Sequence, residues 1–64
     1  MMARYKVWHP RMSPEVTDTI EEAFIKALSF IDVNKGTTRN NVTITREDLP
    51  RPVIVAFIRG RHLE

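Results

Sequence analysis

Cysteine is absent from the 64-residue chain, which excludes a disulfide and a zinc site built on cysteine. Glycine occurs only as Gly36 and Gly60, too few for a glycine-rich loop that binds phosphate. The two histidines, His9 and His62, do not have metal-ligand spacing, so we expect neither a metal nor a cofactor. No apolar run is long enough for a membrane span or a signal peptide, so we expect a cytoplasmic protein with no membrane partner.

The short length places the protein near the limit of independent stability. We expect a single domain over residues 1–62 and interpret Leu63 and Glu64 as a cloning scar. A domain of this size buries only about 60% of the surface of its unfolded chain. Because no disulfide can form, association into a homo-oligomer is the remaining common way to stabilise so small a core.

Charge of neither sign is concentrated in one segment. Ten Lys and Arg residues and eight Asp and Glu residues give a net charge of +2, and they are scattered along the chain. Nucleic-acid-binding proteins usually carry a denser basic stripe. The charge pattern therefore favours a small anionic molecule over nucleic acid as a partner.

One amphipathic helix is predicted from Ser13 to Ile31. Ser13 is a suitable N-cap, Pro14 fits the first helical position, and Glu15 places negative charge in the first turn. Ile25 points away from the apolar stripe, either as a singly exposed side chain or as a contact with another subunit. The stripe itself recurs at helical spacing and comprises Val16, Ile20, Ala23, Phe24, Ala27, Leu28 and Ile31.

Three strands are predicted around this helix, at residues 3–9, 41–45 and 53–58. In the first strand Ala3, Tyr5 and Val7 share one face, and Arg4, Lys6 and Trp8 share the other. The order β-α-β-β predicts an α+β fold with the helix on a small mixed sheet.

The third strand is apolar throughout, which is typical of a strand buried on both faces. One helix covers only one face of a sheet, so a second copy of the chain is expected to cover the other. The alternative is a partly exposed sheet face on a marginally stable monomer.

Arginine and histidine side chains near the strand ends are the candidate ligand contacts. Arg11 follows the first strand and Arg39 precedes the second, and a guanidinium at such a position can bind a carboxylate with two hydrogen bonds. His9 is the titrating side chain nearest to Arg11 and should project from the same face as Val7. The alternative for any one arginine, and the more common case, is a solvated surface charge.

Three short motifs resemble the tautomerase superfamily: Tyr5 to Pro10, the Ser-Pro-Glu start at Ser13, and Val42 to Pro50. The resemblance is to short subunits of the 4-oxalocrotonate tautomerase and cis-3-chloroacrylic acid dehalogenase type. It implies a β-α-β core, a homo-oligomer, and binding or isomerisation of a small unsaturated carboxylate between subunits, with Arg11, Arg39 and His9 as substrate-binding residues.

The family's catalytic group is an amino-terminal proline, and this chain has Met1, Met2 and Ala3 at that position. The catalytic residue therefore stays unknown, and we expect little or no isomerase activity. The alternative is a small basic oligomeric module that binds a protein or a nucleic acid without catalysis.

Overall fold

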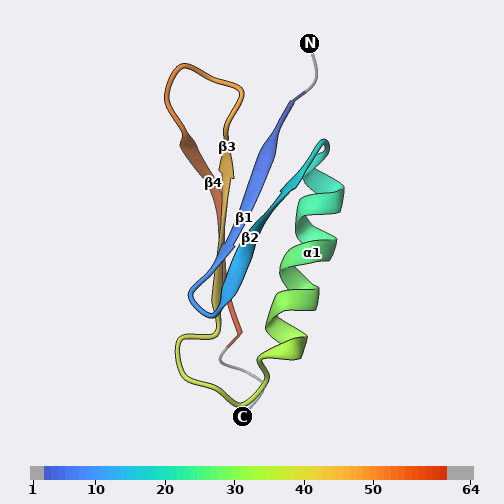
Figure 1. The fold of residues 1–64 in the computed structure, drawn as a ribbon, viewed down its shortest axis with the longest axis vertical. Coiled ribbons are helices and arrows are strands. Elements are labelled where there is room, and N and C mark those ends of the chain that lie inside the picture. The colour runs from blue at the N-terminus through green and yellow to red at the C-terminus, as the bar shows by residue number, and fades with distance from the viewer. Residues whose placement is uncertain (1–2, 61–64) are drawn as a thin grey trace.

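The computed structural model describes residues 3–60, so Met1, Met2, His62 and the suspected scar at Leu63 and Glu64 lie outside the described residues. The protein is a small α+β fold, as predicted, with one helix on one face of a four-stranded sheet (Figure 1). The elements in chain order are β1 (Tyr5–His9), β2 (Met12–Thr17), α1 (Ile20–Val33), β3 (Asn41–Arg46) and β4 (Val53–Arg59).

The expected order β-α-β-β is wrong, because residues 12–17 form a strand and not the first turns of the helix. They pair antiparallel with β1, with Lys6 opposite Val16. A helix from Ser13 would leave this edge of β1 without backbone hydrogen-bond partners. The Ser-Pro-Glu sequence therefore has the pattern of a helix start but lies within a strand.

The true helix start is at Thr19. Its backbone is extended, and its hydroxyl accepts a hydrogen bond of 3.1 Å from the backbone N–H of Glu22. Glu21 and Glu22 add negative charge to the first turn, where the helix dipole favours it. Threonine followed three residues later by glutamate is the sequence pattern of a capping box.

The sheet has the order β2-β1-β3-β4, and every neighbouring pair is antiparallel, so the expected mixed sheet is also wrong. Because β2 and β3 both run antiparallel to β1, they are parallel to each other with β1 between them. Helix α1 connects these two strands across one face of the sheet (Figure 1).

The core lies between α1 and the first three strands in the order β2-β1-β3. Alanines at positions 23 and 27 let the helix approach the sheet closely. Within residues 3–60 the other face carries no helix, and we call it the open face. The buried apolar side chains are Val7, Ala23, Ala27, Phe30, Ile31, Val42 and Ile44.

Strand β4 is exposed in the single chain, although its unbroken apolar sequence is typical of a strand buried on both faces. Ile54 is 67% exposed and Phe57 is 55% exposed. On the helix side, Ala56 and Ile58 pack only against the margin of the core. Val55 is an extra residue between the Ala56 and Ile54 pairings, which makes a bulge relative to β3.

Candidate functional site

The open face of the sheet presents two aromatic rings in one row. Trp8 of β1 and Phe57 of β4 are both paired with Thr43 of β3, which lies between them. Val7, Val42 and Ile44 point to the helix, so their neighbours Trp8 and Thr43 point the other way. With adjacent strands about 4.8 Å apart, the two rings stand roughly 10 Å from each other.

The indole of Trp8 is hydrogen-bonded at its edge, has a cation over the ring and is partly exposed. Its Nε1–H donates a 2.9 Å hydrogen bond to the hydroxyl of Thr45, which lies diagonally across the strand pair. The Nζ atom of Lys6 lies 4.3 Å from the ring centroid, a cation–π contact. The side chain is 38% exposed, so part of an aromatic ring that has a cation over it faces solvent.

Phe57 repeats this arrangement on β4. The guanidinium carbon of Arg59 lies 5.9 Å from the centroid of the phenyl ring. Two residues along a strand share one face, so Arg59 is on the open face with Phe57. Each of the two exposed rings therefore has a positive charge next to it.

The two arginines predicted as ligand contacts lie at one end of the molecule, which we call the basic end. Arg11 is in the turn between β1 and β2, and Arg39 is in the loop between α1 and β3 (Figure 1). Arg59 closes β4 opposite Asn41, beside the same loop. Among residues 3–60 the ion pairs are Lys35–Asp32 and Arg46–Asp48, so none of these three arginines is paired there.

His9 connects the two loops through the core. The amide of Asn40 donates to the carbonyl of Ile31 at 3.0 Å, which leaves its Oδ1 facing His9 Nε2 at 2.9 Å. His9 Nδ1 accepts the backbone N–H of Arg11 at 3.0 Å. Because Nδ1 accepts, Nε2 is the nitrogen that donates to Asn40, and both ring nitrogens have a hydrogen-bond partner. His9 positions Arg11 next to the loop that carries Arg39.

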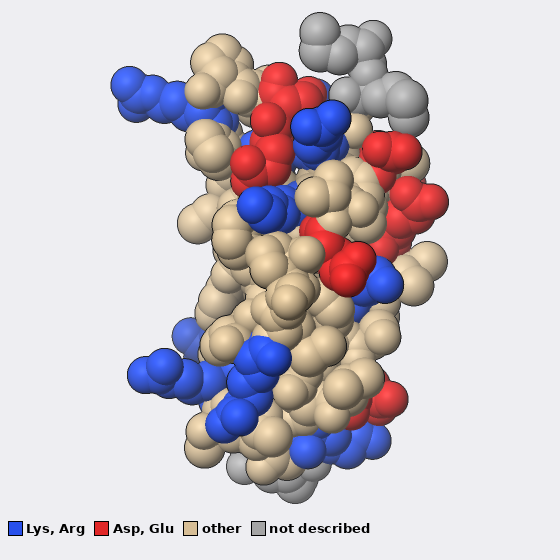
Figure 2. All heavy atoms as spheres, in the orientation of Figure 1, with Lys and Arg blue, Asp and Glu red and all other residues tan. Residues whose placement is uncertain are grey.

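Charge is distributed unevenly over the face drawn in Figure 2. Most Asp and Glu residues lie in its upper half, mixed with Lys and Arg, while the lower end, where the basic end lies, carries mostly Lys and Arg. At the upper end the pKa of Asp48 is lowered to about 2, chiefly by a hydrogen bond from Arg46 with an N–O distance of 2.8 Å. Asp48 also accepts the backbone N–H of Arg4 and so ties the β3–β4 loop to the start of β1.

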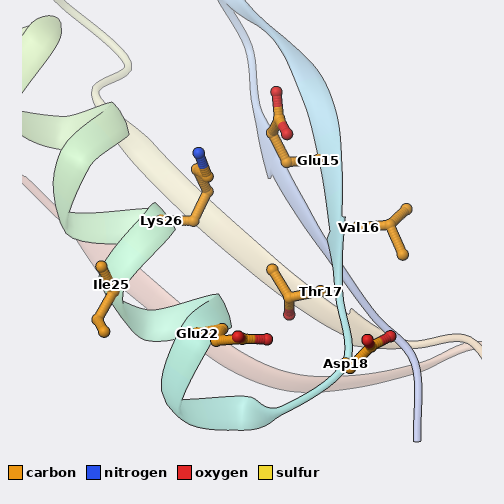
Figure 3. A pocket seen from close by; sticks show the side chains of 7 residues that line it. All are labelled: Glu15, Val16, Thr17, Asp18, Glu22, Ile25 and Lys26. Atoms are coloured by element: carbon orange, nitrogen blue, oxygen red, sulfur yellow. The ribbon is translucent and has the colours of Figure 1, made fainter.

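A hollow of about 440 Å³ lies between β2 and α1, away from the arginines. Figure 3 shows Glu15 and Thr17 pointing toward the helix and Lys26 pointing toward β2, while Val16 points away. Three carboxylates and one ammonium group make it unfavourable for an anion. Its lining residues are Glu15, Val16, Thr17, Asp18, Glu22, Ile25 and Lys26.

The structure brings the predicted residues His9, Arg11 and Arg39 to the same end, but His9 is only 6% exposed, whereas both arginines are exposed. The alternation of residues in the first strand predicts Trp8 and Lys6 on one face, but it does not predict that Phe57 lies in the same row as Trp8. The exposure of Trp8 could be predicted because it alternates with Val7 along the strand, whereas the position of Phe57 depends on how the strands pair.

Comparison with protein-family models, with curated proteins and with solved structures finds no match to this chain. Within the part of the chain that the structure describes, no helix has the length and apolar character needed to cross a membrane. Among residues 3–60, no three or more His, Cys, Asp or Glu side chains are grouped so that they could hold a metal ion.

Proposed function

We propose that the protein binds single-stranded nucleic acid across the open face of its sheet. The observation that carries the proposal is the row Trp8–Thr43–Phe57, in which two exposed rings each have a cation beside them. Exposed rings on an antiparallel sheet are suitable surfaces for stacking unpaired bases, and each stacked base is worth about 1–3 kcal/mol.

The positively charged side chains near the open face also favour single-stranded nucleic acid as the ligand. Lys6 and Arg59 can reach phosphates next to stacked bases, and Arg11 and Arg39 extend the positive surface past the end of the sheet. The acidic hollow lies between β2 and the helix, not on the open face. With few basic residues and no dense stripe, we expect modest affinity, on the order of 10–100 μM near physiological salt.

The test is a fluorescence anisotropy titration with a labelled single-stranded oligonucleotide at several salt concentrations. About four phosphate contacts predict a slope of log K against log salt near −3, at about −0.7 per contact for single strands. Trp8→Leu keeps an apolar side chain but removes the ring, and it should weaken binding about 5- to 150-fold. Ile25→Ala, an exposed change on the helix, is the matched control and should bind normally.

Three results would contradict this proposal. One is the absence of salt-sensitive binding up to millimolar protein. Another is equal affinity of Trp8→Leu and the unchanged chain, since binding would then not use the ring. Preference for a duplex of the same sequence would likewise exclude stacking of unpaired bases, because paired bases do not expose their faces.

A second candidate function is binding of a small unsaturated carboxylate at the basic end, favoured by the placement of Arg11 and Arg39 on neighbouring loops. Millimolar 2-hydroxymuconate should then raise the melting temperature, and Arg11→Ala should abolish that increase. For catalysis, we expect little turnover by the unchanged chain, because Ala3 stands where the tautomerase family has its catalytic proline. An Ala3→Pro variant without Met1 and Met2 should gain ketonisation, unless the binding site itself is missing.

A further inference from the structure

The two edges of the sheet differ in how they are protected against pairing with another strand. The edge strand β2 contains Pro14, which has no N–H to donate, and the charged Glu15. The edge strand β4 has the sequence VIVAFIR, with no proline and a single charge at its last residue. Within residues 3–60, no strand pairs with the outer side of β4.

Exposed apolar side chains are concentrated around β4. Lys26 of the helix projects toward β2 (Figure 3), so Phe24 and Leu28, on the other flank of the buried stripe, project toward the β4 side. Of the eleven large apolar side chains that are exposed among residues 3–60, six therefore lie on β4 or on the helix flank beside it: Phe24, Leu28, Val53, Ile54, Val55 and Phe57.

We propose that two copies of the chain form a dimer by antiparallel pairing of β4 with β4, with Phe57 at the twofold axis. The regular part of β4, which follows the bulge at Val55, then pairs with the same segment of the other copy, with Phe57 at the centre. Ala56 of each copy lies opposite Ile58 of the other, and Val55 lies opposite Arg59. The two Phe57 rings meet as a directly opposed cross-strand aromatic pair, a favourable arrangement on a sheet.

The antiparallel direction is favoured by geometry. Parallel pairing through the same outer edge would require one copy to be turned over about its strand axis, and parallel pairs are slightly less stable per residue. In the antiparallel dimer the two Arg59 side chains are four residues apart along the strand, about 14 Å, which exceeds the Debye length near physiological salt. The outer edge of β4 is therefore complementary to the same edge of a second copy of the chain.

Pairing through β4 alone gives a closed dimer. An interface with twofold symmetry uses the same surface on both copies, and the remaining edges are the protected β2 strands. The result is one eight-stranded sheet with both helices on the same face. The open face becomes continuous across the dimer, although the dimer does not require that this face binds nucleic acid.

Because the chain has no native cysteine, introduced cysteines report directly on this register. Directly opposed Cβ atoms are about 4.5–5.5 Å apart, close enough for a disulfide after small shifts. Phe57→Cys should form a covalent dimer under mild oxidation within minutes. Val16→Cys, equally accessible on the opposite edge strand, is the matched control and should stay monomeric on a non-reducing gel.

Light scattering tests the association without covalent capture. The unchanged chain at tens of micromolar should give about twice its mass of 7.5 kDa. Val55→Lys adds a charge opposite Arg59 twice in the dimer and should give the monomer mass with unchanged far-ultraviolet circular dichroism, whereas Val16→Lys should remain dimeric. A monomer mass for the unchanged chain, or equal cross-linking at positions 16 and 57, would overturn the proposal whether or not nucleic acid binds.

Discussion

His9 and Asn40 are joined in the core by a hydrogen bond of 2.9 Å between the ring Nε2 and the amide oxygen. Asn40 also donates to the Ile31 carbonyl near the end of the helix, and its backbone carbonyl accepts the N–H of Gly60 after β4. Through this one residue, the helix, β1, β3 and the end of β4 are connected at the basic end.

Asn40→Ala should therefore be strongly destabilising. It leaves the His9 Nε2–H and the Ile31 carbonyl buried without these partners, at a cost of about 1–3 kcal/mol for each group. Urea unfolding at a fixed protein concentration measures the loss. Asn41→Ala, at the half-exposed neighbouring position, is the control, and equal destabilisation of the two variants would show that Asn40 is not a structural link.

Part of this architecture could be predicted from the sequence. The amphipathic pattern from Ile20 to Ile31 and the β-branched strands were sufficient for the α+β class. The Ser-Pro-Glu sequence at Ser13 led to a wrong prediction of the helix start. Signals for a helix start are local in the sequence, whereas strand β2 is determined by its pairing with β1. For the same reason, the sequence placed Trp8 on a face but did not bring Phe57 beside it, since that requires the register of β3 with β4.

Gly60 is required because of space and not because of its backbone angle. A Cβ atom there would lie 2.6 Å from the Asn40 carbonyl oxygen and 2.7 Å from Cγ2 of Ile31. Gly60→Ala should cost about 1–3 kcal/mol of unfolding free energy, measured in urea. Gly36→Ala meets no atom within 4 Å but has a φ of +86°, so its cost of about 1 kcal/mol would come from backbone strain alone.

Gly36→Ala is thus a matched control for the clash at Gly60. If Gly60→Ala is as stable as the unchanged chain, the end of β4 does not pack against Asn40 as the structure describes.

Arg39 has the left-handed backbone conformation, with φ of 60°, which costs a non-glycine residue roughly 1–2 kcal/mol. Arg39→Gly should therefore be more stable than Arg39→Ala by about 1 kcal/mol in thermal or urea unfolding. Both variants lose the same cation, so both should weaken oligonucleotide binding equally and make its salt dependence less steep. If Arg39→Ala weakens binding and Arg39→Gly does not, the effect comes from the conformation of the loop and not from the lost charge.

The lowered pKa of Asp48 predicts how the stability of the fold depends on pH. Its pKa is lowered to about 2 in the folded protein, chiefly by the hydrogen bond from Arg46, from an ordinary value of 3.8. A lowered pKa stabilises the fold above the unfolded pKa, and this contribution disappears as the pH falls from about 4 to about 2. Asp48→Asn should accordingly be less stable than the unchanged chain at pH 6, with the difference shrinking toward pH 2.

Asp32→Asn is the control for this pH dependence, because Asp32 is in an exposed ion pair with Lys35 and its effect should be small throughout. A stability difference for Asp48→Asn that stays constant from pH 6 to pH 2 would exclude the charged interaction with Arg46 as its cause.

Emission from Trp8, the only tryptophan in the chain, is the most direct measure of base stacking on the open face. Titration with an unlabelled single-stranded oligonucleotide should quench this emission to saturation, and added salt should restore it as phosphate contacts are lost. Unchanged Trp8 emission, while anisotropy shows the oligonucleotide bound, would contradict a nucleic-acid site on this face.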